Sequence, residues 1–424
     1  MNHLFECSEK VKQLISKGVT IPNPLSIDIG EEVNTDQISG NGVKIYTGCR
    51  IYGKKTVISA GAQLGYEGSV TIDDCQLGPN VELKGGYFKK SVFLEKANMG
   101  LGAQVREGCI LEEEASGAHC VGLKQTILFP FVTLGSLINF CDCFMAGGTS
   151  RKNHSEVGSS YIHFNFTPDG DKTTASLFGD VARGVMLNQP PIFLGGQGGA
   201  VGPLRIGYGN VVAAGTIIRK DILKDNVMVF GKFPRKNTEI EFVPNSYPAL
   251  SRIIENNIIY LANLKALEQW YIHVRRPYFI GEKYGELLFS GVINNLLSAK
   301  SERINRLKVM SEKMPESLKR SAKDERLTSG KKEFYENISL LSEIVDEEFE
   351  DNEIEEYRER FLESFSIHKK NTKADYIETV QAMHSNISKQ GIIWLNKIID
   401  KLCSQMAGVL PSLDLFKNRQ FTGR

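Results

Sequence analysis

The segment between residues 119 and 163 contains the side chains best suited to proton transfer. His119, His154 and His163 are histidines, the residue type whose ordinary pKa is closest to neutral and which most often serves as a general base. Glu156 stands two residues after His154 and can orient its ring, as carboxylates do in base-and-orienter pairs. Histidines near turns also serve as plain surface hydrogen-bonding groups. The sequence therefore predicts a base at His154 or His163, with the absence of any base as the alternative.

The elements that must position these groups are indicated by a repeat of six residues. Aliphatic residues recur at every sixth position in the part of the chain that holds most of the 40 glycines. A period of six fits neither an α-helix nor an alternating strand, but it fits a solenoid with three short strands per coil. We predict a parallel β-helix of hexapeptide repeats, with chance clustering in a β-sandwich as the alternative. The runs are Ile45, Ile51 and Val57; Phe93, Met99, Val105 and Leu111; and Ile206, Val212 and Ile218.

The composition changes near residues 235–248, where glycine becomes scarce and Leu, Ile, Lys and Glu dominate. We expect a lead-in helix and linker over residues 1–22, with the helix at 3–16. The β-helix is expected over residues 23–240 and an α-helical domain over 248–424. Apolar spacing of three and four from Ile254 to Leu267 predicts a helix that ends near Trp270. Further helices are predicted at 283–299, 300–327, 331–348, 353–365 and 372–407.

The bulk properties exclude several classes. The net charge of +1 gives no reason to expect nucleic acid as a partner. The segment from Met1 to Gly18 lacks an apolar leader, and no apolar run is long enough for a membrane span, so a cytoplasmic location is expected. Eight dispersed cysteines indicate free thiols in a reducing compartment. Cys141-Phe-Cys143 is not a paired zinc motif, and no metal is predicted.

Several motifs up to about residue 236 resemble one bacterial family. They are Gly18-Val-Thr-Ile-Pro-Asn-Pro, Val105-Arg106-Glu-Gly108, Val121-Gly-Leu-Lys124, Gly158-Ser-Ser-Tyr-Ile-His-Phe-Asn165-Phe166 and Val201-Gly-Pro-Leu-Arg-Ile-Gly. They resemble the C-terminal acetyltransferase domain of the bifunctional glucosamine-1-phosphate acetyltransferase and N-acetylglucosamine-1-phosphate uridyltransferase family. The resemblance implies a left-handed β-helix and a homotrimer. No uridyltransferase domain precedes Gly18, so uridyl transfer is not expected.

The resemblance also implies roles for particular residues. Arg106 and Lys124 would hold the phosphate of an amino sugar. Their separation equals three hexapeptides, or one full coil, which stacks the two cations on one face, unless they are only solvated surface cations. Further substrate contacts are implied at Asn165, Phe166 and Lys172. Contacts to acetyl-CoA, the expected co-substrate, are implied at Ser159, Gly196, Ala213 and Lys232.

The chain departs from the family where the catalytic histidine is expected. Counting back from Gly158 gives Asp142 that place, and six added residues near 128–139 would reconcile this count with Lys124. Glu156 stands in place of an asparagine, and an insertion lies around 181–191. Asp142 therefore joins His154 and His163 as a candidate base.

The first hypothesis is an N-acetyltransferase that acts on an amino-sugar phosphate or a nucleotide-sugar. The second is a non-catalytic scaffold that keeps the three-sided β-helix, or prism. The missing histidine and the helical extension favour this second hypothesis. The third is a partner subunit of a separate uridyltransferase.

Overall fold

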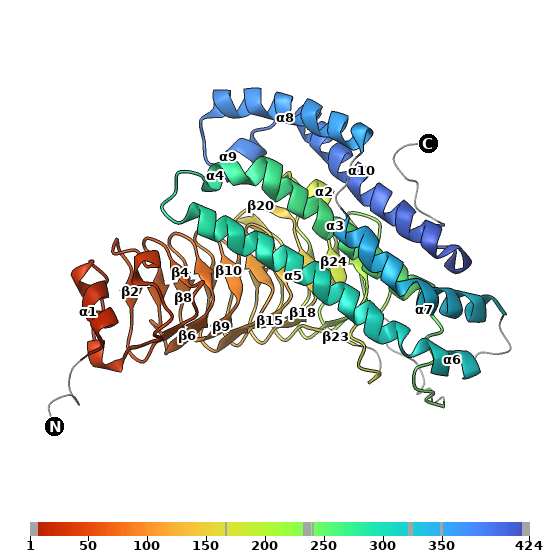
Figure 1. Ribbon diagram of the computed structural model, residues 1–424, viewed down its shortest axis with the longest axis horizontal. Helices are drawn as coiled ribbons and strands as arrows, with labels where there is room; N and C mark the ends of the chain where they lie inside the picture. Colours follow the sequence, from red (N-terminus) through yellow and green to blue (C-terminus); the bar gives the residue numbers. More distant parts are fainter. Residues whose placement is uncertain are drawn as a thin grey trace.

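The computed structural model describes residues 7–165, 168–231, 239, 241–320, 325–347 and 351–417. Its first part is a parallel β-solenoid whose axis is horizontal in Figure 1. The predicted solenoid is therefore confirmed. Short helix α1 (Glu9–Ser16) precedes the first coil and buries Val11 and Leu14.

Three parallel sheets form the walls of the solenoid, and we number them in the order in which the chain visits them. Sheet 1 has ten strands in the described residues, sheet 2 has eight and sheet 3 has ten. We name the corners after the sheets that they join: the 1–2 edge, the 2–3 edge and the 3–1 edge. Sheet 1 comprises β1 (Asp28–Ile29), β3 (Arg50–Tyr52), β6 (Val70–Asp73), β9 (Gly86–Lys89), β12 (Ala103–Val105), β15 (Gly122–Lys124), β18 (Asn139–Cys141), β23 (Ile162–Phe164), β26 (Gly199–Val201) and β29 (Ile217–Ile218).

Sheet 2 comprises β4 (Val57–Ile58), β7 (Gln76–Leu77), β10 (Ser91–Phe93), β13 (Cys109–Leu111), β16 (Ile127–Leu128), β19 (Cys143–Met145), β24 (Ser176–Phe178) and β27 (Arg205–Ile206). Sheet 3 comprises β2 (Lys44–Ile45), β5 (Gln63–Leu64), β8 (Glu82–Leu83), β11 (Asn98–Met99), β14 (Ser116–Gly117), β17 (Thr133–Leu134), β22 (Glu156–Val157), β25 (Phe193–Leu194), β28 (Val211–Val212) and β30 (Met228–Val229).

The hexapeptide repeat arises because one inward side chain per sheet fills the solenoid core. Ile45, Ile51 and Ile58, one from each sheet, are fully buried. Successive coils pair in register, as Val92 does with Ile110 in the next coil. The backbone hydrogen bonds therefore run between coils, and the apolar side chains stack in columns.

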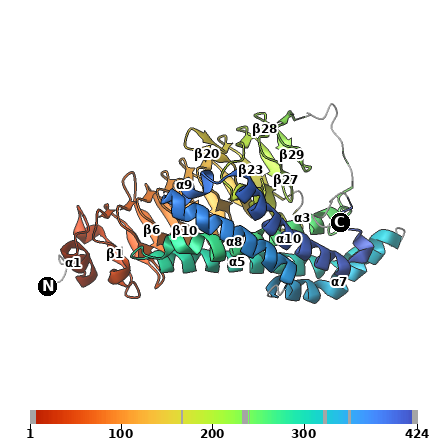
Figure 2. The ribbon, with the colours of Figure 1, turned by 90° about the horizontal axis from the view of Figure 1, so that it is seen from above.

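The second part of the structure is helical and covers sheet 2. Helix α5 (Gly285–Ser311) packs on β7, β10 and β13, and α3 (Leu250–Trp270) packs on β24. Helices α8 (Asn352–Thr372) and α10 (Ser385–Val409) form an outer layer, with α10 packed on both α3 and α8 (Figures 1 and 2). The remaining described helices are α2 (Val181–Gly184), α4 (Arg276–Phe279), α6 (Met314–Arg320), α7 (Glu325–Asp346) and α9 (Tyr376–Gln381).

Several helix boundaries differ from the prediction, and two of these differences can be explained by the fold. Helix α5 is continuous through residues 299 and 300, where the apolar pattern suggested a break. The predicted helix over 372–407 is divided into α9 and α10. Both differences have a physical reason: α5 lies along several coils of sheet 2, whereas residues 372–384 turn the chain back over the solenoid.

Buried charges join the helices to the solenoid. Arg275, at the end of a π-helical turn (Tyr271–Arg275), pairs with Glu112 at 2.9 Å and also with Glu113. Its guanidinium lies over the Tyr376 ring, 4.0 Å from the ring centroid. Burial raises the pKa of Glu112 to about 7, against the influence of the positive Arg275. These residues fix where the helices lie on sheet 2.

The extra residues of the solenoid are not where the sequence comparison placed them. Ile110 pairs with Ile127 and Leu123 pairs with Phe140, so these coils are no longer than three hexapeptides and the segment 128–139 contains no insertion. The long coil instead contains an antiparallel hairpin of β20 (Gly148–Ser150) and β21 (Asn153–His154) at the 2–3 edge. The predicted insertion around 181–191 contains α2, whose Val181 N–H donates to Asn263 of α3 at 2.9 Å.

Candidate active site

Arg106 and Lys124 lie one coil apart at the 1–2 edge. Val105 of β12 pairs with Leu123 of β15, so the next residues, Arg106 and Lys124, follow in the same register. The backbone N–H of Arg106 donates to the Leu123 carbonyl at 2.8 Å. The Lys124 ammonium pairs with Glu107 at 2.9 Å, while Arg106 is exposed. The stacking predicted from the spacing of these two residues is present.

Lys172 belongs to the same edge, although the chain reaches it two coils later. Burial raises the pKa of the Cys141 thiol, while the positive charges of Arg106, Lys124 and Lys172 oppose that rise. Cys141 follows Lys124 in the register of sheet 1. We call Arg106, Lys124 and Lys172 the cationic edge. Three cations around one position form a surface suited to a phosphate or another anion.

A hollow of about 570 Å³ lies on the outer surface of sheet 1, beside the cationic edge. Gly122 lines this hollow and lies between Gln104 and Asn139 in successive coils. A Cβ on Gly122 would come no closer than 3.7 Å to any neighbouring atom, and the residue does not have a positive φ. The fold therefore does not require glycine here, and the missing side chain opens the hollow. Its wall extends from Arg106 and Cys141 to Cys120 and Leu137.

Ser159, Gly196 and Ala213 form a column along the 3–1 edge. Ser159 Oγ accepts from the N–H of Ser136, and the Ser159 carbonyl accepts from the N–H of Gln197, which follows Gly196. The carbonyl of Gly196 in turn accepts from Gly215, two residues after Ala213. A Cβ on Gly196 would lie 2.8 Å from the Ser159 carbonyl oxygen. Close coil stacking thus requires the small residues, which also leave a thin, smooth edge.

His119 is a candidate base that its sequence context alone does not distinguish. It is exposed at the 3–1 edge, where its Nδ1 lies 2.8 Å from Ser136 Oγ. Ser136 is in turn bonded to Ser159, so His119 adjoins the column of Ser159, Gly196 and Ala213. If Nδ1 donates to the hydroxyl, Nε2 has a free lone pair. The available signal was its position shortly before Lys124, in the turn that leads into the strand ending at Lys124.

His154 lies on the hairpin at the 2–3 edge, away from both groups. Its Nδ1 is 2.8 Å from the Arg151 carbonyl, which can only accept, so Nδ1 carries a proton and Nε2 is the free base. Glu156 Oε2 lies 3.9 Å from Nε2. The Arg151 carbonyl therefore orients the ring, whereas the prediction gave this role to Glu156. Glu156 can pair with the ring once it is protonated.

His163 and Asp142 are both buried. In β23 the alternation of side chains directs Ile162 outward and His163 into the core, where Nε2 lies 2.8 Å from Ser176 Oγ. Burial lowers the pKa of His163 to about 4. Asp142 is paired with Arg303 of α5 at 2.7 Å. These positions argue against either residue acting as a base at the surface.

The hairpin also explains why Asp142 was selected. The position of the family's catalytic histidine is Asp142 when it is counted back from Gly158, because that count crosses the hairpin residues. Counted forward from Lys124, the same position is Ser136, six residues earlier. Ser136 is the hydrogen-bond partner of His119.

Of the other predicted residues, Asn165 is exposed directly after β23, at the 1–2 edge. Phe166 and Lys232 lie outside the described residues.

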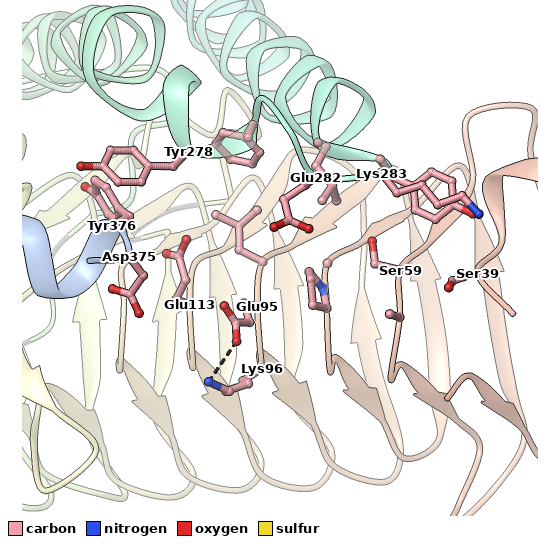
Figure 3. A pocket seen from close by; sticks show the side chains of 18 of the residues that line it. Ser39, Ser59, Glu95, Lys96, Glu113, Tyr278, Glu282, Lys283, Asp375 and Tyr376 are labelled. Atoms are coloured by element: carbon pink, nitrogen blue, oxygen red, sulfur yellow. Dashed lines mark ion pairs between the residues drawn. The ribbon is translucent and has the colours of Figure 1, made fainter. Parts of the chain in front are cut away.

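A larger groove, of about 1030 Å³, runs along the 2–3 edge beneath the helices (Figure 3). Carboxylates and tyrosines gather at one end of it, and the labelled side chains include Glu113, Asp375 and Tyr278. Six carboxylates line the groove against four cations, of which Lys96 pairs with Glu95 and Arg275 with Glu113. This balance disfavours a phosphorylated ligand, so the hollow on sheet 1 is the better candidate site.

The described residues contain no group of three or more His, Cys, Asp or Glu side chains suited to hold a metal ion. All eight cysteines are described, and each is a free thiol. Among the helices that the structure describes, none has the length and apolar character needed to cross a membrane.

Comparison with curated proteins supports the resemblance. The chain is 27% identical over 215 residues to the bifunctional protein GlmU of Thermotoga maritima, which covers 50% of this chain and 42% of that protein. Half of the chain is homologous to GlmU. The GlmU of Carboxydothermus hydrogenoformans is 26% identical over 213 residues, and that of Acinetobacter baumannii is 26% identical over 237 residues. The chain spans less than half the length of these GlmU relatives. No family model matches the chain.

Two solved structures resemble parts of the fold. LpxA from Acinetobacter baumannii aligns with 66% of this chain and 95% of its own, at 13% identity and a TM-score of 0.18. A perosamine N-acetyltransferase from Caulobacter crescentus, in complex with CoA and GDP-perosamine, aligns with 50% of this chain and 54% of its own, at 10% identity and a TM-score of 0.11. Scores this low add nothing to the assignment.

Proposed function

We propose that the chain is a hexapeptide-repeat acyltransferase that moves an acetyl group from acetyl-CoA to the amine of an amino-sugar phosphate or nucleotide-sugar. The observation that carries this proposal is the arrangement on sheet 1. An open hollow over Gly122 separates the cationic edge from the edge that holds His119, Ser159 and Gly196. One side of the sheet suits an anionic acceptor and the other a thin thioester donor.

Each group of residues has a role in this reaction. The cationic edge holds the phosphate, and Asn165 and Phe166 contact the sugar. Ser159, Gly196, Ala213 and Lys232 bind the donor, the small residues because a pantetheine arm lies against backbone at such an edge. In the reaction the amine nitrogen attacks the thioester carbonyl, so that a C–N bond forms and the C–S bond breaks. The base takes the amine proton and returns it to the departing thiolate.

His119 is the preferred base because it adjoins the donor column and its Nε2 is free when Nδ1 donates to Ser136. His154 is the second candidate, since the Arg151 carbonyl also leaves its Nε2 free. It lies at a different edge, and it would reach sheet 1 only from a neighbouring chain. His163 and Asp142 are buried and are not assigned a part in the reaction.

We further propose a left-handed solenoid and a homotrimer, as the family resemblance implies. Sheets 1 and 3, and the 3–1 edge between them, carry exposed apolar side chains outside the area of sheet 2 that α3 and α5 cover. Their members are Leu137, Ile162, Phe193, Ile217 and Met228, between 38% and 63% exposed. A second prism against these faces would bury them. The molar mass by light scattering tests this assembly.

The test of function is a thiol-release assay with acetyl-CoA and a series of amino-sugar phosphates and nucleotide-sugars. We expect release that depends on the acceptor and falls when its phosphate is removed. If calorimetry detects no binding of CoA at millimolar concentration, the transferase assignment is wrong. Binding of CoA and sugar phosphate without turnover would support the scaffold alternative, which the burial of Asp142 favours.

A further inference from the structure

Residues that follow the solenoid, between positions 245 and 313, bond to the loop that carries Lys172. The Asp169 carboxylate accepts from the backbone N–H of Asn245 at 3.2 Å, and its carbonyl accepts from Lys313. The Asp171 carboxylate accepts from the Tyr247 hydroxyl at 2.6 Å. This loop leaves the solenoid between β23 and β24, and its conformation is therefore set by residues more than 70 positions away in the sequence.

Two further bonds fix the backbone directly after the Lys172 side chain. Asn257 of α3 donates to the Thr173 carbonyl at 3.1 Å. Arg303 of α5 donates through Nη1 to the Lys172 carbonyl at 3.1 Å, and through Nη2 to Asp142 at 2.7 Å. Arg303 is only 2% exposed, and its bond to Asp142 is buried. One buried guanidinium thus joins the loop to the corner that follows Cys141.

Lys172 has a left-handed backbone conformation, with φ of 56°. A lysine adopts this conformation at an energetic cost, which surrounding contacts must offset. Its side chain is nevertheless exposed, although its neighbours Asp171 and Thr173 are buried. The loop therefore directs a single cation outward while its flanking residues are anchored beneath the helices.

The segment that provides Tyr247 is itself anchored. The carbonyl of Ser246 accepts from the buried Lys331 ammonium of α7 at 2.8 Å. The path from α7 through Ser246 and Tyr247 to Asp171 consists of hydrogen bonds and covalent links without a break. Rigid elements on both sides of the loop can thus impose its conformation.

We propose that the helical half acts as a clamp on residues 169–173, and that Tyr247 and Arg303 are positioning residues that hold Lys172 against Arg106 and Lys124 for anion binding. This inference rests on the proposed function, because that proposal makes Lys172 a ligand of the acceptor phosphate. It gives residues 245–331 a role in the affinity of a site that they do not line. Loss of a clamp bond lets the loop sample other conformations, which lowers the fraction of the chain able to bind.

The test measures the affinity of the full chain for inorganic phosphate by calorimetry, together with KM and kcat for the acceptor. Tyr247→Phe removes one hydroxyl from the clamp. We expect it to weaken phosphate binding several-fold and to raise KM with kcat unchanged. Tyr335→Phe is the matched control, since Tyr335 is an exposed tyrosine on α7. Arg303→Lys keeps the positive charge but loses the guanidinium that bonds to both the Lys172 carbonyl and Asp142. We expect it to act like Tyr247→Phe.

A thermodynamic cycle with Lys172→Ala separates positioning from general stability. In the Lys172→Ala background, Tyr247→Phe should have no further effect on phosphate affinity, because there is no longer an ammonium to position. An equal effect in both backgrounds, or no effect of Tyr247→Phe in the parent, overturns the clamp. If Lys172→Ala leaves phosphate affinity unchanged, the clamp inference also falls, whereas thiol release from acetyl-CoA shows separately whether the transferase proposal survives.

Discussion

Arg303 of helix α5 and Asp142 of the solenoid form a buried ion pair, with 2.7 Å between Nη2 and Oδ1. The other carboxylate oxygen accepts from the Thr174 hydroxyl at 3.3 Å. Burial raises the pKa of Asp142, and the charge of Arg303 counteracts this effect. The carboxylate that the sequence comparison selected as a possible base therefore serves to join the two halves of the chain.

Arg303→Met should destabilise the protein by about 3–5 kcal/mol, because it leaves the Asp142 carboxylate buried without its cation. The double variant Asp142→Asn/Arg303→Met should be less destabilised than the sum of the two single variants. Urea denaturation of all four proteins measures this coupling. Additive losses would mean that the two side chains do not stabilise each other.

Arg106→Ala and Lys124→Ala should each weaken binding of the acceptor about 10- to 100-fold, as the loss of a charge-assisted hydrogen bond implies. The effect should appear in KM for phosphorylated acceptors and diminish at high salt. Lys96→Ala, which removes a cation at the 2–3 edge, is the control. If all three variants weaken acceptor binding equally, the cationic edge is not the phosphate site.

Gly122→Val should abolish acceptor binding without unfolding the solenoid. The backbone conformation of Gly122 is compatible with a side chain, and a Cβ at this position would lie 3.7 Å from its nearest neighbouring atom. Valine also has a higher strand propensity than glycine. We therefore expect an unchanged or higher melting temperature together with loss of turnover. A stable Gly122→Val protein with parental KM would show that the acceptor binds elsewhere.

His119→Ala should reduce kcat about 10²- to 10⁴-fold, as expected for removal of a general base. His154→Ala should have a small effect if its position at the 2–3 edge keeps it from the hollow. The reverse pattern would move the base to the hairpin and require that a neighbouring chain supply it.

His163 should make the protein sensitive to acid. Its pKa is about 4 in the folded chain, below the ordinary value near 6.5, so the unfolded chain binds more protons between these values. This contribution to stability is present above pH 6.5, is lost as the pH falls toward 4, and amounts to about 3 kcal/mol. His163→Gln should flatten the dependence of the melting temperature on pH over this range. An unchanged slope would mean that other groups cause the acid sensitivity.

The solenoid was predictable because its physical cause is local and repeated. One inward aliphatic residue per sheet and tight glycine turns specify a coil of three hexapeptides, and that interval alone stacks Arg106 on Lys124. The helical second half was likewise predictable from its apolar spacing. The continuity of α5 was not, because the long contact with sheet 2 that supports it is not visible in local sequence.

Only the tertiary structure decided which polar residues meet. Counting along the sequence could not distinguish an insertion at 128–139 from the hairpin at 148–154. It therefore assigned Asp142, and not Ser136, to the position of the family's catalytic histidine. The strand alternation buried His163, and α5 buried Asp142, whereas His119 remained exposed. The sequence by itself determined the columns of the prism, since these follow from a constant period. Which column is covered, and which stays open to a ligand, depended on helices whose contacts join residues more than a hundred positions apart.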